Sequence, residues 1–132
     1  MKLFLDNNLS PRIAAALRPL VEPYGHLVLH LRDRFPASTS DEAWLSALSA
    51  ERGWCVLTLD RGIRKKPHER SLWLTTDVVI FFLASGWNRM TPVEQAGRLL
   101  LRWGDLVAQA DLVRPPAAFL VRVKGKLSQL PL

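Results

Sequence analysis

The sequence opens with Lys2-Leu3-Phe4-Leu5-Asp6-Asn7-Asn8-Leu9-Ser10-Pro11, in which a short apolar run ends at an acid. The run is apolar on both faces, as expected of a buried strand in a parallel sheet. Ser10 followed by Pro11 is typical of a helix start, because serine caps free N–H groups and proline fits the first helical position. The stretch therefore predicts a strand that delivers Asp6 to its carboxyl end, followed by a helix.

A second strand of this kind is expected in the middle of the chain. The near-continuous apolar run 54–59 ends at Asp60, and a polar turn follows. Ligands and catalytic groups of open α/β sheets gather at the carboxyl ends of the strands. Since parallel strands all point the same way, we expect Asp6 and Asp60 at the same edge.

Two further acids begin a helix that is expected over residues 41–52. Asp41 and Glu42 stand in its first turn, where an acid stabilises a helix by about 0.3–1 kcal/mol through the helix dipole. A helix between two parallel strands returns antiparallel to them, so it begins at the carboxyl edge. Asp41 and Glu42 can therefore serve both the helix and a site at that edge.

Hydrophobic periodicity predicts the remaining elements. Further strands are expected at 26–31, 78–83 and 118–123, and further helices at 10–21 and 92–110. In the strand at 26–31, the face formed by Leu27, Leu29 and Leu31 is expected to pack under a helix. In the long helix, Val93 is among the residues that we expect to be buried.

This alternation of strands and helices predicts an α/β fold, with a mostly parallel central sheet between two helix layers. The length of 132 residues fits one domain. We assign that domain to residues 1–124 and expect a loose C-terminal tail at 125–132.

Composition excludes several classes of protein. No apolar run approaches the roughly 18 residues of a membrane span, and the opening strand with its acid is unlike a signal peptide. The single cysteine, Cys55, permits no intramolecular disulfide and lies in an apolar strand, where we expect it to be inert. The three histidines lack zinc-ligand spacing, and there is no glycine-rich phosphate loop. We expect a cytoplasmic protein with no membrane partner.

The chain is strongly basic, with a net charge of +6 and a pI of about 10.2. Residues 61–70 concentrate this charge, with five basic side chains against the single acid Glu69. They are Arg61, Arg64, Lys65, Lys66 and Arg70. Such an excess favours polyanions, RNA and DNA first among them. An inert basic surface and an acidic partner protein stay open as alternatives.

Three or four carboxylates are thus expected along one edge of the sheet. Close carboxylates repel one another unless a cation neutralises them, and ligands that are all oxygens suit Mg²⁺ or Mn²⁺. The alternative for each acid alone is a cap of a turn or helix. The convergence of Asp6, Asp60 and the Asp41–Glu42 pair favours a metal site.

The same topology predicts which edge of the sheet each polar residue around the strand at 78–83 occupies. Asp77 precedes that strand, so it is expected at the opposite edge. Ser85 and Asn88 follow the strand and are placed to support a site at the acidic edge.

Three stretches of the sequence resemble the PIN-like superfamily, in order over about residues 1–85. They are Leu3-Phe4-Leu5-Asp6-Asn7-Asn8-Leu9-Ser10-Pro11, Ser40-Asp41-Glu42 and Leu57-Thr58-Leu59-Asp60. The sequence looks closest to the VapC-like branch, which is related to toxin ribonucleases. The resemblance implies a metal-dependent ribonuclease, often the toxin of a toxin–antitoxin pair. It also implies that Asp6, Asp41 and Asp60 bind Mg²⁺ or Mn²⁺, with Glu42 competing for the middle place. Relatives often have an acid directly after the first aspartate, where this chain has Asn7.

The leading hypothesis from the sequence is metal-dependent hydrolysis of RNA phosphodiester bonds. The catalytic candidates are Asp6, Asp41, Glu42 and Asp60, with Asn7, Ser85 and Asn88 in support. Basic side chains would clamp the RNA backbone. These are Arg12, Arg61, Lys65 and Lys66. An antitoxin protein and a second copy of the chain, as a homodimer, are further expected partners.

Two rival hypotheses stay open. A receiver-like signalling domain also places acids after its first and third strands, and would use Asp60 as phosphoacceptor with Thr75 or Thr76 and Lys124 as helpers. It leaves Asp41 and Glu42 without a role. The second rival is a non-catalytic PIN-like module that binds nucleic acid or a partner protein without metal.

Overall fold

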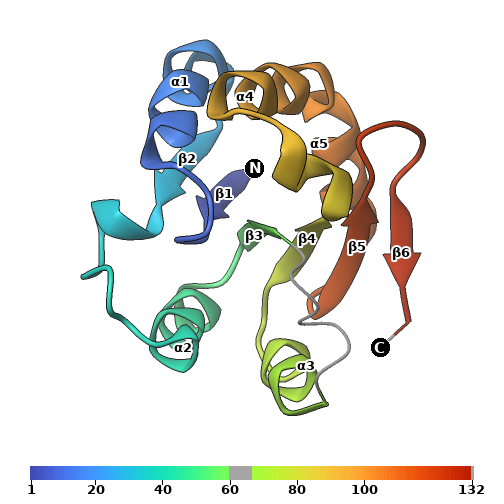
Figure 1. The fold of residues 1–132 in the computed structure, drawn as a ribbon. Coiled ribbons are helices and arrows are strands. Elements are labelled where there is room, and N and C mark those ends of the chain that lie inside the picture. Colours follow the sequence, from blue (N-terminus) through green and yellow to red (C-terminus); the bar gives the residue numbers. More distant parts are fainter. Residues whose placement is uncertain (60–66, 132) are drawn as a thin grey trace.

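The computed structural model describes the backbone of residues 1–59 and 67–131 and the side chains of residues 1–59 and 70–131. Its centre is a six-stranded sheet in the order β2-β1-β3-β4-β5-β6 (Figure 1). The strands are β1 (Lys2–Leu5), β2 (Leu27–His30), β3 (Trp54–Leu59), β4 (Val79–Leu83), β5 (Ala117–Val121) and β6 (Ser128–Leu130). The first five are parallel to their neighbours, and β6 pairs with β5 antiparallel.

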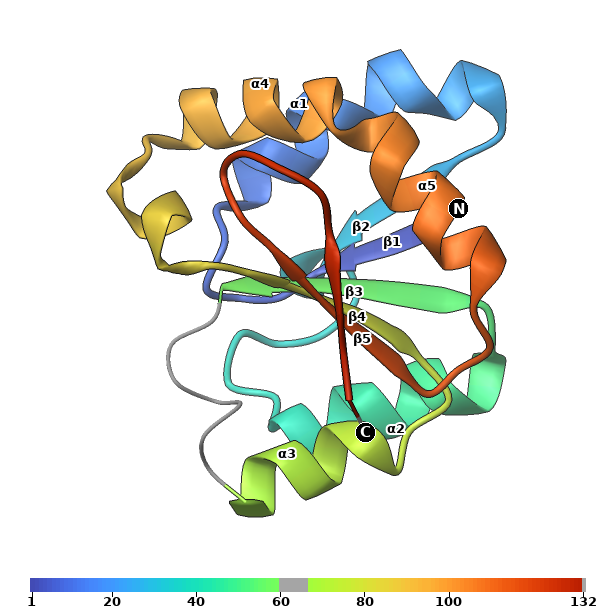
Figure 2. The ribbon, with the colours of Figure 1, turned by 90° about the vertical axis from the view of Figure 1, so that its right-hand side faces the viewer.

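Helices cover both faces of the sheet, which makes three layers (Figure 2). The α-helices are α1 (Pro11–Val21), α2 (Asp41–Glu51), α3 (Pro67–Leu74), α4 (Pro92–Leu101) and α5 (Trp103–Leu112). Short 3-10 helices are η1 (Glu22–Tyr24), η2 (Leu31–Asp33) and η4 (Ser85–Arg89). One hydrophobic core lies between the sheet and α1, α4 and α5, and the other lies under α2 and α3. The predicted α/β fold is confirmed.

Capping residues fix where the helices begin. The Ser10 hydroxyl accepts from the backbone N–H of Arg12 at 3.2 Å, and the Ser40 hydroxyl accepts from that of Ala43 at 3.2 Å. Each bond satisfies one of the N–H groups that a helix leaves free at its first turn. Because α1 and α2 directly follow the segments that leave β1 and β2, their first turns lie at the carboxyl edge of the sheet.

The helix predicted over residues 92–110 is two helices, separated at Arg102, whose φ is −99° and ψ is 3°. The Arg102 side chain is buried and donates to the carbonyl oxygens of Arg122, at 2.6 Å, and Gly125. Contacts with a distant part of the chain therefore accompany the break. The burial predicted for Val93 is wrong, since this side chain is 81% exposed on the solvent face of α4.

The prediction for the second strand is also wrong in part. Val28 and His30 are fully buried. On the face expected to pack under a helix, Leu31 is buried in the core under α2 and Leu29 packs against that core, whereas Leu27 is 38% exposed. Because β2 is an edge strand, its leucine face is only partly covered, while Val28 belongs to the core under α1.

The C-terminal residues differ from the loose tail expected at 125–132. Gly125 has a φ of +92°, a value that glycine adopts readily, and the chain reverses there. Residues Ser128–Leu130 then form β6, with Leu120 opposite Ser128. A hydrogen bond of 2.8 Å from Arg122 Nη1 to the Ser128 hydroxyl ties the two strands together. In the part of the chain that the structure describes, no helix has the length and apolar character needed to cross a membrane.

Candidate functional site

The central side chain of the candidate site is that of Asp6, which directly follows β1 and is only 7% exposed. Its Oδ2 accepts a hydrogen bond from the Thr58 hydroxyl at 2.8 Å, and its Oδ1 accepts from the backbone N–H of Asn7 at 2.6 Å. The Asp6 backbone N–H donates to Leu57 O at 3.0 Å, which continues the pairing of β1 with β3. Both carboxylate oxygens are therefore held in place.

The Asn8 side chain fastens the turn after β1 to the end of β3. Its Nδ2 donates to the Thr58 hydroxyl oxygen at 3.1 Å and to Leu59 O at 3.3 Å, and its Oδ1 accepts from the Leu59 N–H at 3.3 Å. The Thr58 hydroxyl therefore accepts from Asn8 while it donates to Asp6. This chain of hydrogen bonds orients the carboxylate, and Thr58 is fully buried within it.

Burial raises the pKa of Asp6 above its ordinary value. The hydrogen bonds from Thr58 and Asn7 oppose this shift in pKa, because they favour the ionised carboxylate, and the negative charge of Asp41 adds to it. No described side chain forms an ion pair with Asp6. A bound cation would offset both the desolvation of this carboxylate and its repulsion from Asp41.

The two acids at the start of α2 lie in different surroundings. Asp41 is the first residue of the helix, its Oδ1 accepts from the Trp44 indole N–H at 3.2 Å, and its charge acts on Asp6. Glu42 instead lines a groove between α2 and α3, together with Ser49 of α2. The charge of Asp41, and not that of Glu42, is among the causes that raise the pKa of Asp6.

Several predicted site residues lie outside the described residues. They are Asp60, Arg61, Lys65 and Lys66. The described part of β3 ends at Leu59, whose backbone is bound by Asn8 at the Asp6 edge. Within residues 1–59 and 70–131, no three His, Cys, Asp or Glu side chains lie close enough together to hold a metal ion.

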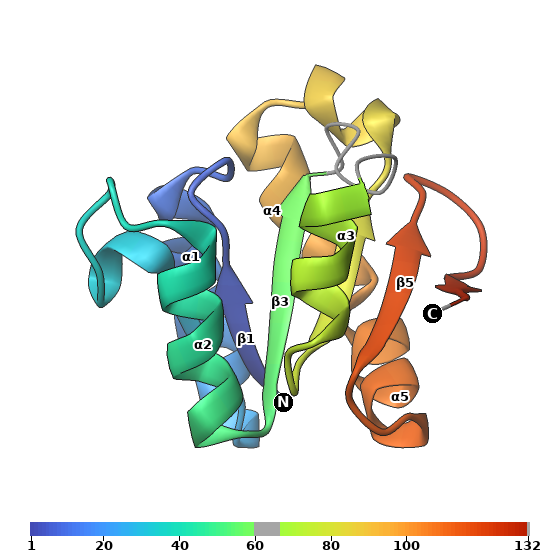
Figure 3. The ribbon, with the colours of Figure 1, turned by 90° about the horizontal axis from the view of Figure 1, so that it is seen from below.

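The remaining candidates are exposed at the carboxyl edge. Arg12 is the second residue of α1, and Ser85 and Asn88 lie on η4, directly after β4. Figure 3 shows the arrowheads of β1, β3 and β5 pointing to the same side, where the yellow segment that includes η4 also lies. No side-chain hydrogen bond or ion pair joins Ser85 or Asn88 to Asp6, so the structure places these two residues only at this edge.

The opposite edge holds Asp77, as the topology predicts. Its backbone N–H donates to the Ser49 hydroxyl at 2.8 Å, and its carboxylate lies 3.7 Å from Arg52 Nε. Thr75 and Thr76, the helpers expected of a receiver-like domain, also precede β4, and their hydroxyls donate to carbonyl oxygens of α3 at 2.9 and 2.7 Å. The structure therefore does not bring these threonines to the acidic edge.

Sequence reasoning missed three polar residues that build the site, namely Asn8, Thr58 and His30. Thr58 interrupts an otherwise apolar buried strand, which is a signal for a buried polar group with a partner. His30 is fully buried, its Nε2 lies 2.7 Å from Leu9 O, and its Nδ1 accepts from the Arg32 N–H at 3.0 Å. Nε2 is therefore the donor and Nδ1 the acceptor, so both ring nitrogens of His30 bind backbone groups of the fold.

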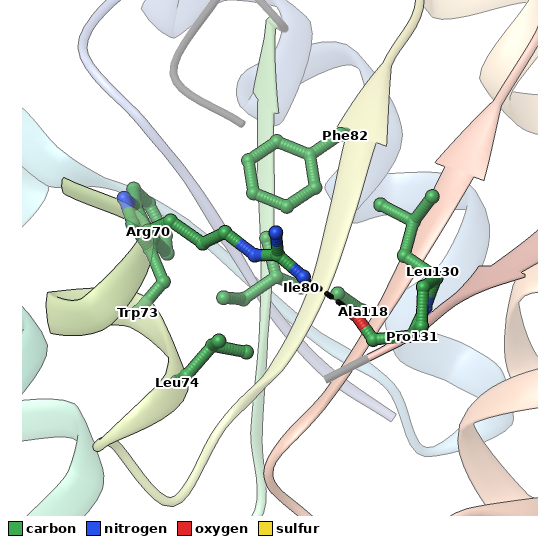
Figure 4. Close-up of a pocket in the computed structure, with 8 residues that line it drawn as sticks. All are labelled: Arg70, Trp73, Leu74, Ile80, Phe82, Ala118, Leu130 and Pro131. Carbon is green, nitrogen blue, oxygen red and sulfur yellow. Dashed lines mark hydrogen bonds between the residues drawn. The ribbon is translucent and has the colours of Figure 1, made fainter. Parts of the chain in front are cut away.

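An apolar pocket lies away from the acids. It has a volume of about 180 Å³ and lies between α3 and the C-terminal strand, with an apolar lining that includes Trp73, Ile80 and Phe82 (Figure 4). Arg70 Nη2 reaches across it to Pro131 O, at 3.0 Å. No carboxylate lines this pocket, so it is distinct from the acidic site. The thiol of Cys55 is buried too, and burial raises its pKa to about 11, which fits the inert role expected of it.

These features define an α/β domain with an acidic site at the carboxyl ends of its parallel strands. Residues 1–85 match the family described as PIN like domain, so the chain belongs to the PIN-like domain family. Comparisons with curated proteins and with solved structures gave no significant match. PIN-like domains are commonly nucleases and generally use divalent metal ions. Asp6 and Asp41 fit such an ion, because carboxylate oxygens are the ligands that Mg²⁺ and Mn²⁺ prefer.

Proposed function

We propose that the protein is a metal-dependent endoribonuclease that hydrolyses RNA phosphodiester bonds. The observation that carries this proposal is the buried Asp6 carboxylate, held by Thr58 and Asn7 beside the charge of Asp41. An acid with a pKa perturbed by burial and by a second acid is typical of a functional site. The net charge of +6 suits a polyanionic substrate.

Asp6, Asp41 and Asp60 are proposed to hold one or more Mg²⁺ or Mn²⁺ ions. When bound, such an ion lowers the pKa of a coordinated water and offsets negative charge on the phosphate. Asp41 is preferred to Glu42 because its charge acts on Asp6, whereas Glu42 lines the groove between α2 and α3.

The other residues of the edge have supporting roles in this proposal. Thr58 and Asn8 fix the direction in which Asp6 presents its carboxylate. Basic side chains bind phosphates of the RNA backbone, and Ser85 and Asn88 contribute hydrogen bonds at the rim. The proposed backbone contacts are Arg12, Arg61, Lys65 and Lys66.

The resemblance to VapC-like ribonucleases supports a narrower proposal. The protein would then be the toxin of a type II toxin–antitoxin pair in the cytoplasm, forming a homodimer and bound by an antitoxin. In this proposal the nuclease domain comprises residues 1–124 together with β6, which pairs with β5. Co-expression with the product of the adjacent reading frame tests the pairing, since an antitoxin would co-purify with the chain and suppress its activity.

One observation favours a second candidate, a PIN-like module that binds RNA without cleaving it. Asn7 stands where relatives often have an acid. This candidate predicts RNA binding that persists in EDTA and no cleavage with any divalent ion.

Cleavage of a structured RNA in Mg²⁺ or Mn²⁺ separates the two candidates. The wild type is expected to cleave, and Asp6→Asn and Asp60→Asn are expected to remove the activity, as is EDTA. Asp77→Asn is the matched control, because Asp77 lies at the opposite edge of the sheet. Equal activity in the wild type, Asp6→Asn and Asp60→Asn, or activity that survives EDTA, would contradict the metal mechanism.

A further inference from the structure

The side-chain amide of Asn7 joins the end of β1 to the connection between β2 and α2. Its Oδ1 accepts a hydrogen bond from Arg32 Nε at 2.8 Å, and its Nδ2 donates to Ala37 O at 3.3 Å. The amide provides both an acceptor for Arg32 and a donor for Ala37, whereas a carboxylate has no N–H to donate. Asn7 is therefore matched to these two partners.

Arg32 is held at the carboxyl edge by two further features. It lies in η2, directly after β2, and the register that pairs Leu5 with His30 brings this point beside the end of β1. Its backbone N–H donates to His30 Nδ1 at 3.0 Å. The backbone and the Nε of this exposed residue are thus both fixed, and the bond to Asn7 uses neither of its terminal Nη atoms.

The neighbouring arginines have carboxylate partners. Arg18 pairs with Asp33, and Arg34 pairs with Glu51, with Arg34 Nη1 2.7 Å from Glu51 Oε2. This contact with Arg34 lowers the pKa of Glu51 to about 2. Within the described part of the chain, no carboxylate pairs with Arg32.

We propose that Arg32, aligned by Asn7, forms a phosphate-binding subsite on the β2 side of Asp6. The ligand is a phosphate of the RNA backbone, which the planar guanidinium binds through its Nη atoms. This inference rests on the proposed ribonuclease function and adds a residue to it. It also explains Asn7, because an acid at this position would neutralise Arg32 and repel the carbonyl oxygen of Ala37.

Binding of a fluorescently labelled single-stranded RNA, measured by anisotropy with Ca²⁺ in place of Mg²⁺, tests the subsite. Arg32→Ala is expected to weaken binding about tenfold, because a charge-assisted hydrogen bond is lost. It is also expected to reduce the slope of log K against log salt by about 0.7, the value for one phosphate contact on a single strand. Arg34→Ala removes an equal charge from the same connection and is the matched control, with a much smaller expected effect.

Two more variants keep the test decisive if Arg32→Ala disturbs folding. Arg32→Lys keeps the charge but loses the bond to Asn7 and the planar fork, so its affinity should lie between those of the wild type and Arg32→Ala. Asn7→Asp is expected to weaken RNA binding, because its carboxylate neutralises Arg32. Tighter RNA binding by Asn7→Asp would overturn the subsite.

The outcomes separate this inference from the function on which it rests. A wild type that cleaves RNA, together with equal affinities for Arg32→Ala and Arg34→Ala, would overturn the subsite and leave the ribonuclease proposal standing. A wild type that neither binds nor cleaves RNA would overturn both. The inference predicts weaker binding by Arg32→Ala and Asn7→Asp, an intermediate affinity for Arg32→Lys, and an affinity close to that of the wild type for Arg34→Ala.

Discussion

Asp6 and Asp77 lie at opposite edges of the same sheet and have different surroundings. Asp77 lies within 3.7 Å of Arg52, so a cation of the chain itself accompanies its charge. Asp6 is buried, is oriented by neutral donors, and lies near a second acid. The fold alone accounts for the charge of Asp77, whereas the charge of Asp6 has no partner among the described side chains, and for it we propose a bound metal ion.

The largest difference between the two edges is expected when each acid is replaced by its amide. Asp6→Asn is expected to lower RNA cleavage about a thousandfold, because a metal ion contributes several kcal/mol of transition-state stabilisation. Asp77→Asn is expected to stay within about twofold of the wild type, since exposed ion pairs contribute little. Initial rates of cleavage under saturating Mn²⁺ measure both. Similar losses in the two variants would remove the distinction between the edges.

The pair at the start of α2 provides a second comparison. Asp41→Asn is expected to lower cleavage about a hundredfold, and Glu42→Gln less than about threefold, because only Asp41 acts electrostatically on Asp6. The same cleavage assay checks this order. The reverse order would assign the metal to Glu42 and require the first turn of α2 to lie differently.

Thr58 tests whether orientation of Asp6 matters. Thr58→Val keeps the shape of the buried side chain but removes the donor to Asp6 Oδ2, and a loss of roughly tenfold to a hundredfold in activity is expected. Thr58→Ser restores the hydroxyl and should recover most of the activity. Full activity in Thr58→Val, with unchanged thermal stability, would show that the hydrogen bond is dispensable.

Stability should change in the opposite direction to activity at Asp6. Because burial raises the pKa of Asp6 in the folded state, its favourable contribution is complete below the unfolded pKa and is lost as the pH rises through the folded pKa. Asp6→Asn should therefore increase the free energy of unfolding by about 1 kcal/mol at pH 7, with a smaller gain toward pH 3. Urea unfolding of both proteins in EDTA over this pH range provides the measurement. A variant that is less stable at pH 7 would indicate that Asp6 serves the fold.

Much of the fold could be predicted from the sequence because its local signals agree with one another. The apolar run before Asp6 and the Ser10-Pro11 pair mark a strand and a helix start, and both occur as predicted. The start of α2 at Asp41 follows from Ser40 in the same way. Parallel topology then fixes which edge each strand end occupies.

The features that escaped prediction depend on contacts between distant parts of the chain. The break between α4 and α5 involves Arg102 and carbonyl oxygens some twenty residues away. The exposure of Leu27 follows from the edge position of β2, which no local pattern reveals. Strand β6 likewise depends on pairing with β5.

The acids of the candidate site could be predicted from the sequence, whereas the hydrogen bonds that hold them could not. Asp6 and Asp41 could be assigned to one edge because topology alone requires it. The hydrogen bonds from Asn8 to Thr58 and from Arg32 to Asn7 span 50 and 25 residues, so they could be found only from the structure. Asp60 stays a prediction.

Titration of Mn²⁺ into the wild type, Asp6→Asn and Asp77→Asn, followed by isothermal calorimetry without RNA, is the most direct test of a metal site at Asp6. The wild type and Asp77→Asn are expected to bind Mn²⁺ with the same affinity, and Asp6→Asn is expected to lose this binding. Equal binding by all three proteins, or no binding by any of them, would contradict a metal site at Asp6.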